Sequence, residues 1–225
     1  APSPAWARGV ATAWRIDEEL DETFPEYDAR LAVEDNRMYV VTLSSVRAYD
    51  ISGSKPALLW NSPLTSEDFA PKPIVWGDRL VAGRTILTAD SGQVVSSLPA
   101  AIEGTAIGVV DSVLVVCGER SEQCWGVDTS LNRLWTAEGP GWMLPGVFQT
   151  ASAGGRTWIY FDTTWKKDFH TVIEARTGAT AELGFKAGTP SLVVPAADGW
   201  LVEKFDHLTL MTTDADGTVR QTFTL

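Results

Sequence analysis

The sequence repeats itself at intervals of about 40 residues, the length of a propeller blade, and this repeat limits the possible folds more than any other feature. Each copy contains short runs rich in Val, Ile, Leu and aromatic residues, separated by turns of Gly, Asn, Asp and Ser. Four short strands and their turns need about 40 residues. Equivalent points near the end of the third run of each copy are Asp50, Asp90, Asp128, Arg176 and Asp214, with one longer step between Asp128 and Arg176.

The order of runs and turns predicts four antiparallel strands in each copy, because apolar runs bounded by turn residues are typical of a meander. Five copies predict an all-β fold, a β-propeller or partial propeller of about five four-stranded antiparallel blades. An irregular β-sandwich is the alternative. We expect one propeller-type domain over residues 1–225, or a fragment of a longer propeller, with blades at about 27–62, 72–100, 105–137, 147–185 and 190–225.

Two copies resemble the repeat of PQQ-like (quinoprotein-type) propellers. In that family a strand ending in Ala-x-Asp is followed by a Gly turn and then by a strand ending in Trp. In the first copy this motif runs from Asp50 through Gly53 to Trp60, and in the third copy it runs from Asp128 to Trp135. The fourth copy departs from the pattern, because Arg176 stands in place of the Asp.

The resemblance implies a blade and does not imply an activity, since the family spans quinone-dependent dehydrogenases, assembly scaffolds and extracytoplasmic binding proteins. A PQQ-dependent dehydrogenase fragment is a remote alternative. Those enzymes have a calcium site beside the cofactor, often with adjacent cysteines, and here the two cysteines, Cys117 and Cys124, are not adjacent. We therefore expect no cofactor.

Charge and hydropathy exclude further classes. The chain has 29 acidic and 18 basic residues and a formal net charge of −11. Nucleic-acid binding depends on clustered Lys and Arg, so we expect no nucleic-acid partner. No apolar run approaches the roughly 20 residues that a membrane-spanning helix needs, so we expect no membrane span in this chain. His170 and His207 fall in different copies, and neither lies beside a nucleophile, which argues against a zinc site and against catalysis by these residues.

The two cysteines occur at the end of one predicted strand and the start of the next. Cys117 and Cys124 flank a six-residue loop, and a hairpin brings such positions together, so a disulfide across the middle strands of the third blade is predicted. Two free thiols in a cytosolic protein are the alternative. A disulfide would indicate an oxidising compartment. We expect an extracytoplasmic protein, secreted or anchored through a segment absent from this chain.

Long connections gather on one rim of the predicted blades, at 61–73, 118–123, 137–146 and 162–169. Long loops on a rigid scaffold are where binding residues concentrate. Aromatic residues beside positive charge suit a partner contact. The alternative is that these side chains fill the channel or pack between blades. The candidates for partner contact are Trp142, Trp165, Lys166, Lys167 and Phe169.

These observations favour a non-enzymatic extracytoplasmic binding or scaffold propeller that presents the long loops of one rim to a protein or glycan partner. The alternative from another class is a hydrolase or other enzyme with acidic residues in the channel. The sequence places no such pair of carboxylates.

Residues 11–16 (ATAWRI) read as an outer strand without a blade of its own. An open array of blades leaves apolar faces at both ends, which are costly to expose to water. We therefore expect either a homodimer through the open blade faces or addition of this strand to a neighbouring blade. A closed five-bladed monomer, with Trp14 packed under the last blade, is the competing arrangement.

Overall fold

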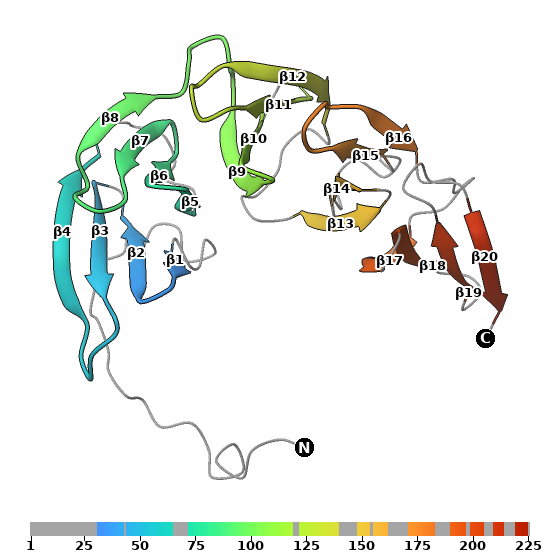
Figure 1. Cartoon of the computed structure of the whole chain (residues 1–225), viewed down its shortest axis with the longest axis horizontal. Coiled ribbons are helices and arrows are strands. Elements are labelled where there is room, and N and C mark those ends of the chain that lie inside the picture. The colour runs from blue at the N-terminus through green and yellow to red at the C-terminus, as the bar shows by residue number, and fades with distance from the viewer. Residues whose placement is uncertain are drawn as a thin grey trace.

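The computed structural model of the chain consists of five four-stranded antiparallel sheets in series, which confirms the predicted all-β fold of a partial propeller. The five sheets follow one another along an open arc (Figure 1). The structure describes residues 31–42, 44–64, 72–118, 122–139, 148–153, 155–161, 171–182, 190–196, 199–204, 209–213 and 219–224. Among these residues, no helix has the length and apolar character needed to cross a bilayer.

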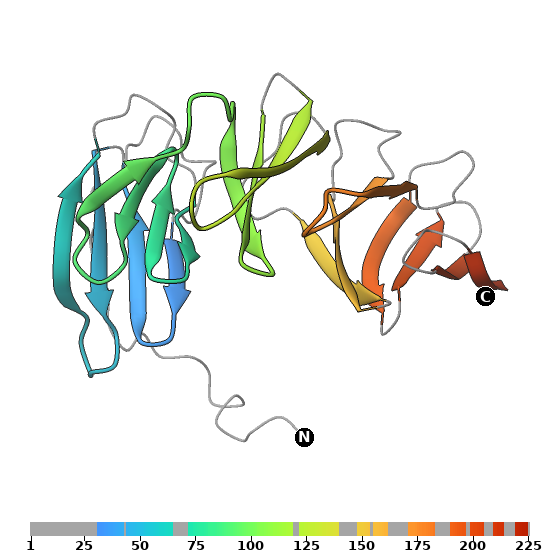
Figure 2. The same ribbon diagram turned by 45° about the horizontal axis from the view of Figure 1, so that its top comes forward.

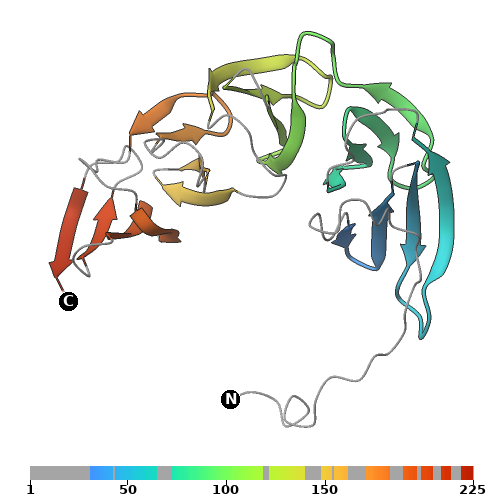
Figure 3. The ribbon, with the colours of Figure 1, turned by 180° about the vertical axis from the view of Figure 1, so that it is seen from behind.

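Within each sheet the strands are neighbours in chain order, so every sheet is a simple meander, and we number the sheets as blades 1 to 5. The inner strands β1, β5, β9, β13 and β17 lie on the concave side of the arc, and the outer strands β4, β8, β12, β16 and β20 lie on its convex side (Figures 1 and 3). Blade 1 contains β1 (Leu31–Glu34), β2 (Arg37–Val41), β3 (Ser45–Asp50) and β4 (Ala57–Pro63); blade 2 contains β5 (Ile74–Trp76), β6 (Arg79–Ala82), β7 (Thr85–Thr88) and β8 (Val94–Ser97); blade 3 contains β9 (Thr105–Val110), β10 (Val113–Cys117), β11 (Gln123–Val127) and β12 (Arg133–Glu138); blade 4 contains β13 (Gln149–Ala153), β14 (Arg156–Tyr160), β15 (Thr171–Glu174) and β16 (Thr180–Glu182); blade 5 contains β17 (Pro190–Ala196), β18 (Gly199–Lys204), β19 (Thr209–Thr213) and β20 (Val219–Thr224).

The core lies between the blades. Successive residues of a strand point to opposite faces of its sheet, so the long apolar runs of the middle strands cover both faces. On β10, Val115 packs toward blade 4 while Val116 packs toward blade 2, and both side chains are fully buried. Separate apolar clusters fill the interfaces of blades 1 and 2, of blades 2 and 3, and of blades 3 and 4. The blades therefore stand side by side and share their faces (Figure 2).

The outer strands of blades 1, 2, 3 and 5 each contain one extra residue near the start of the strand. In blade 1, Trp60 pairs with Ala48 because Leu59 is left out of the pairing between β3 and β4. In a regular ladder Trp60 would pair with Arg47 and lie on the opposite face. The bulge therefore turns Trp60 toward blade 2. In blades 1 to 3 the extra residues are exposed aliphatics: Leu59 (46%), Val95 (49%) and Leu134 (48%).

The tryptophan that follows the bulge joins its blade to the next one in two places. The indole N–H of Trp60 donates to the carbonyl of Ala89 in blade 2, at 3.1 Å. In the same way, the indole N–H of Trp135 donates to the carbonyl of Ala175 in blade 4, at 2.9 Å. Both carbonyls belong to the turn between the third and fourth strands of the receiving blade.

Each receiving turn contains a glycine on which the indole lies. Gly92 has a φ of +68°, and a Cβ there would stand 2.4 Å from the ring of Trp60. Gly178 has a φ of +71°, and a Cβ there would stand 2.6 Å from Trp135. Only glycine meets both demands, because other residues are strained at positive φ and would collide with the indole.

Aspartates close the corresponding turns of blades 1 and 3. The Asp50 carboxylate accepts a hydrogen bond from the N–H of Ser52 at 2.8 Å, and Asp128 accepts from the N–H of Ser130 at 2.9 Å and of Asn132 at 2.8 Å. The pKa of Asp50 is lowered chiefly by the Ser52 hydroxyl, and that of Asp128 chiefly by the Asn132 N–H. Their contribution to stability is therefore present above pH ~3.9 and is lost as the pH falls through the lowered pKa.

In blades 2 and 4 the capping position belongs to Thr88 and Glu174. The buried Glu174 carboxylate accepts a hydrogen bond from the N–H of Thr177 at 2.7 Å, and the Thr88 hydroxyl accepts one from the backbone at the end of its turn, at 3.2 Å. Asp90 and Arg176 lie two residues further on, inside the turn. Aligning Asp90 and Arg176 with the capping aspartates is therefore wrong. In blades 2 and 4 the turn is capped by the last residue of the third strand, Thr88 or Glu174.

An ion pair also joins blade 1 to blade 2, and another joins blade 3 to blade 4. The acidic partner lies on the second blade at the first interface and on the first blade at the other. Arg37, which begins the second strand of blade 1, pairs with Asp90 in the turn of blade 2. At the interface of blades 3 and 4 the acid is Asp111 of blade 3 and the base is Arg176 of blade 4, with Nε and Oδ2 3.4 Å apart. The Arg that breaks the sequence pattern in the fourth copy thus completes an ion pair of reversed polarity.

The interface between blades 2 and 3 is built differently. Strand β8 carries no Trp after its bulge, and the indole of Trp76 on the inner strand β5 donates instead to the carbonyl of Ser112 at 2.8 Å. Arg79 donates to the carbonyl of Thr129 at 2.6 Å, and its guanidinium stands 5.7 Å from the centre of the Trp76 ring. A tryptophan of the outer strand thus joins blade 1 to blade 2 and blade 3 to blade 4. A tryptophan of the inner strand joins blade 2 to blade 3.

Replacing Trp135 by Ala should lower the free energy of unfolding by about 3–5 kcal/mol, because it removes a buried aromatic side chain and leaves a cavity. The matched control is the neighbouring bulge residue Leu134, whose replacement by Ala should change stability by no more than about 0.5 kcal/mol, since it is half exposed. Urea unfolding of both variants measures the difference. Equal losses for the two would contradict the assigned role of the bulge.

Candidate interaction rim

The connections of the blades fall on two rims. The hairpins between first and second strands and between third and fourth strands form one rim, and the remaining connections form the other, which we call the connector rim. Strands take residues from three of the predicted long loops, since β4 extends to Pro63, β11 begins at Gln123 and β12 extends to Glu138. The predicted contact residues lie outside the described part of the chain: Trp142, Trp165, Lys166, Lys167 and Phe169.

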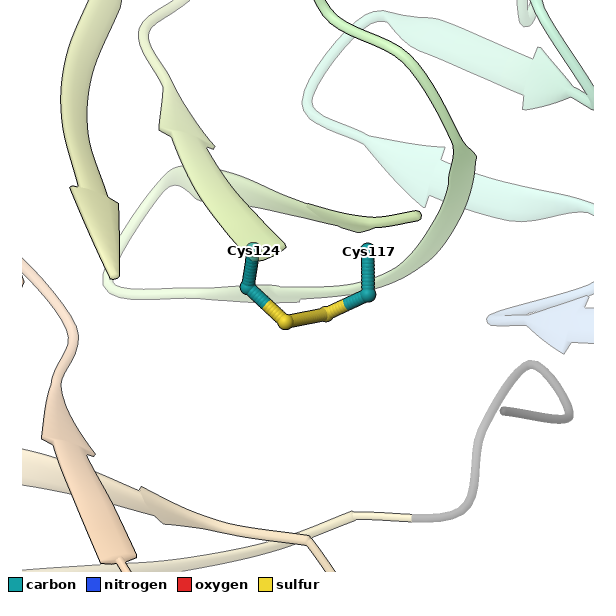
Figure 4. Close-up of a disulfide and its surroundings, with 2 residues drawn as sticks. All are labelled: Cys117 and Cys124. Carbon is teal, nitrogen blue, oxygen red and sulfur yellow. A yellow bond between two sulfur atoms is a disulfide. The ribbon is translucent and has the colours of Figure 1, made fainter. Parts of the chain in front are cut away.

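A disulfide joins Cys117 to Cys124 at the base of the connector rim, as predicted (Figure 4). The two residues are direct partners on the middle strands β10 and β11, with Cα atoms 4.1 Å apart. The adjacent pair is hydrogen-bonded, with the N–H of Gly118 donating to Gln123 at 2.9 Å. Cys117 and Cys124 therefore occupy a non-hydrogen-bonded position, where side chains of opposite strands come closest. Both cysteines are buried.

Two connectors pack directly on the disulfide. Gly104, just before β9, has a φ of +145°, and a Cβ there would stand 2.3 Å from the Cys117 carbonyl oxygen. Gly139, just after β12, lies against the other cysteine, and its Cβ would stand 2.6 Å from the Sγ of Cys124. Any side chain at either glycine would force the connector away from the bridge. The chain thus enters blade 3 against the backbone of Cys117 and leaves it against the Sγ of Cys124.

Arg84 holds the connector that leads into Gly104. It lies in the short turn between β6 and β7, and its guanidinium donates hydrogen bonds to carbonyls of the segment between β8 and β9. The backbone carbonyl of Arg84 in turn accepts from the N–H of Leu98 at 2.8 Å. The four carbonyls that accept from the guanidinium are those of Leu98 (3.0 Å), Pro99 (3.0 Å), Ile102 (2.7 Å) and Gly104 (3.3 Å).

Arg84, the connector and the disulfide form one continuous support, which we call the rim base. It runs from blade 2 through the 98–104 segment to both middle strands of blade 3 and ends at Gly139. Arginine suits this place because its planar guanidinium carries five donors and never loses its charge. No local pattern in the sequence points to Arg84, because its acceptors are backbone carbonyls 14 to 20 residues away.

On the opposite rim, the acidic side chains that cap the turns between third and fourth strands serve the structure. In the described ranges, no group of three His, Cys, Asp or Glu side chains could hold a metal ion. The capping carboxylates Asp50, Asp128 and Glu174 all accept backbone hydrogen bonds. Lowered pKa values, as at Asp50 and Asp128, keep a carboxylate ionised, whereas a general acid needs a raised pKa. These acids are therefore structural caps.

Comparison with known proteins supports the fold. No protein-family model matches the chain, and no curated protein matches its sequence. Virginiamycin B lyase from Staphylococcus aureus is similar in structure with a TM-score of 0.51 at 9% identity, over 86% of this chain and 68% of that chain. A streptogramin B lyase (TM-score 0.46) and a europium-containing methanol dehydrogenase (0.47) are each 14% identical over 87% of this chain, and over 67% and 50% of their own. At 9% identity the first similarity shows the fold alone.

The disulfide should resist alkylation. We expect the denatured, non-reduced protein to take up no iodoacetamide and the reduced protein to take up two equivalents, as measured by intact mass. Its contribution to stability should stay below the ~3 kcal/mol of a ~15-residue loop, because the loop it closes is shorter. Two labelled thiols in non-reduced material would refute the bridge.

Replacing Arg84 by Met should cost about 1–3 kcal/mol of unfolding free energy, because part-buried carbonyls of the 98–104 segment lose their donors. Arg84→Lys should recover only part of the loss, since an ammonium has three donors where the guanidinium has five. The exposed Arg133 serves as the control, and Arg133→Met should leave the urea midpoint almost unchanged. Equal effects at the two positions would contradict the role of Arg84.

Proposed function

We propose that this protein is a non-enzymatic extracytoplasmic binding or scaffold protein that presents the loops of the connector rim to a protein or glycan partner. The observation that carries the proposal is the rim base. Arg84, the 98–104 segment and the disulfide fix the connector rim at blades 2 and 3. The rim base reaches Gly139, which precedes the loop that carries Trp142. A loop held at its root loses less conformational entropy on binding, which increases the affinity that it can reach.

The proposed contact residues are the aromatic and basic side chains of the long loops: Trp142, Trp165, Lys166, Lys167 and Phe169. Large aromatic rings provide contact area at low entropic cost, and they stack on peptide or sugar surfaces. Two adjacent lysines stand out in a chain of net charge −11 and would favour an acidic partner group beside the aromatic contact.

The disulfide supports the proposed location. Thiols are kept reduced in the cytosol, whereas bridges persist in secreted, periplasmic and surface proteins. Three of the described carboxylates, those of Asp50, Asp128 and Glu174, are engaged as caps of turns.

A binding screen with rim variants tests the proposal. Immobilised glycans and extended peptides are offered to the wild-type chain, and each ligand that binds is titrated against Trp142→Ser and against Trp165→Ser combined with Lys166→Glu and Lys167→Glu. We expect at least a tenfold loss of affinity in one of the two rim variants, as for a contact hot spot. The matched control, Val95→Ser on the exposed outer strand β8, should bind as the wild type does.

Two results would overturn the proposal. One is turnover of a bound glycan or peptide that persists in homogeneous protein, which would make the chain an enzyme. The other is a ligand whose affinity falls with Val95→Ser and is unchanged by both rim variants, which would place binding on the convex side of the arc.

A further inference from the structure

Indole hydrogen bonds join blades 1 to 4 in series, and the tryptophans that donate them have fixed places in the register. Trp60 and Trp135 of the outer strands donate to blades 2 and 4, and each pairs with the residue two positions before the cap of its turn. Trp76, which donates to blade 3, is the last residue of the inner strand β5. These two positions show where blade 4 would carry an indole if it joined blade 5 in the same way.

Blade 4 has an alanine at both positions. The cap of its turn is Glu174, and Val172, two positions before it, pairs with Ala181 on the outer strand β16. The inner strand β13 ends at Ala153, the register position that Trp76 occupies in blade 2. Neither position can therefore supply an indole hydrogen bond to blade 5.

Other aromatic side chains lie between blades 4 and 5. On β14, Ile159 packs toward blade 3, so its neighbours Trp158 and Tyr160 point toward blade 5. Trp200 on β18 lies against them from blade 5, with its ring centre 5.8 Å from that of Tyr160. All three aromatic side chains are buried. The interface of blades 4 and 5 thus closes around aromatic rings.

The tryptophans of this interface hold their donors unpaired. In the described part of the chain, the buried indole N–H groups of Trp158 and Trp200 have no hydrogen-bond partner. A buried donor without an acceptor has lost its hydration, and opening returns this free energy because water can then accept the bond. At the other interfaces opening breaks an indole–carbonyl bond instead. Opening therefore costs least between blades 4 and 5.

We propose that the array of blades opens between blades 4 and 5, so that blade 5 separates while blades 1 to 4 stay together. Blade 5 has a described sheet on one side only (Figure 1), so its separation breaks one interface. Blade 1 also lies at an end of the arc, but the indole of Trp60 and an ion pair hold it to blade 2. The open form exposes Trp158, Tyr160 and Trp200, an aromatic surface that the closed form buries.

Hydrogen exchange of the indole N–H groups, followed by NMR of the full chain in D₂O, tests this proposal. Trp→Phe variants assign the resonances. We expect the N–H groups of Trp158 and Trp200 to exchange at one common rate, at least about tenfold faster than those of Trp76 and Trp135. Both fast rates should rise together in dilute urea, because urea favours an opening that exposes surface.

Trp158→Phe and Trp135→Phe are a matched pair of variants. Both remove the same atoms, whereas only Trp135 has a carbonyl acceptor among the described residues. Trp135→Phe should speed amide exchange in β14 and β15 at least about tenfold, because a hydrogen bond is lost together with packing. Trp158→Phe should change the exchange rate of the Trp200 indole by less than about threefold, because removing an unpaired donor offsets the lost packing.

The proposal fails in three cases. Equal exchange rates for all four indoles would show that the interface of blades 4 and 5 is no weaker than the others. Different urea dependences for Trp158 and Trp200 would show that no single opening exposes both. A nuclear Overhauser effect from long-lived water to either indole, or equal accelerations by the two variants, would show that the donors are paired in the closed form.

Discussion

Each blade of this protein carries apolar side chains on both of its faces, and this constraint governs the rest of the structure. Val115 and Val116 are neighbours on β10 and are both fully buried, yet they pack against different blades. A sheet of this kind cannot bury its surface alone, so its stability depends on the blades beside it. The interfaces are accordingly where the specific contacts occur, and the hydrogen bond from Trp135 to the Ala175 carbonyl is the clearest of them.

The contacts between neighbouring blades alternate between two sets, although each blade has the same four-stranded form. Blades 1 and 3 each send a bulge-turned tryptophan and one partner of an ion pair onto the glycine turn of the next blade. The interface of blades 2 and 3 uses Trp76, Arg79 and the support from Arg84 to the disulfide. The charges of the two ion pairs are exchanged, with the acid on blade 2 at one interface and on blade 3 at the other. Two kinds of contact therefore alternate along blades 1 to 4, and the rim base belongs to the interface of blades 2 and 3.

Much of the fold could be predicted from the sequence because strand runs and turn residues are local signals. The five meanders and the Cys117–Cys124 bridge follow from such signals. The function of Trp60 could not be predicted, because one extra residue, Leu59, reverses the face on which it lies and nothing local reveals the bulge. The equivalence of Asp90 and Arg176 with Asp50 and Asp128 is wrong, since Thr88 and Glu174 accept the hydrogen bonds that close the turns of blades 2 and 4. No local pattern predicts the role of Arg84, because its partners are distant carbonyls. The loop residues proposed as partner contacts remain predictions.

Native-state hydrogen exchange of two tryptophan variants tests most directly whether each interface stabilises its own blades. If Trp60 stabilises mainly the interface of blades 1 and 2, Trp60→Phe should accelerate exchange in β6 and β7 and leave β14 and β15 at the wild-type rate. Trp135→Phe should do the reverse, because sub-global opening spreads mainly to the partner that has lost its contact. Uniform acceleration of all four blades by either variant would contradict the account and show that the interfaces are equivalent.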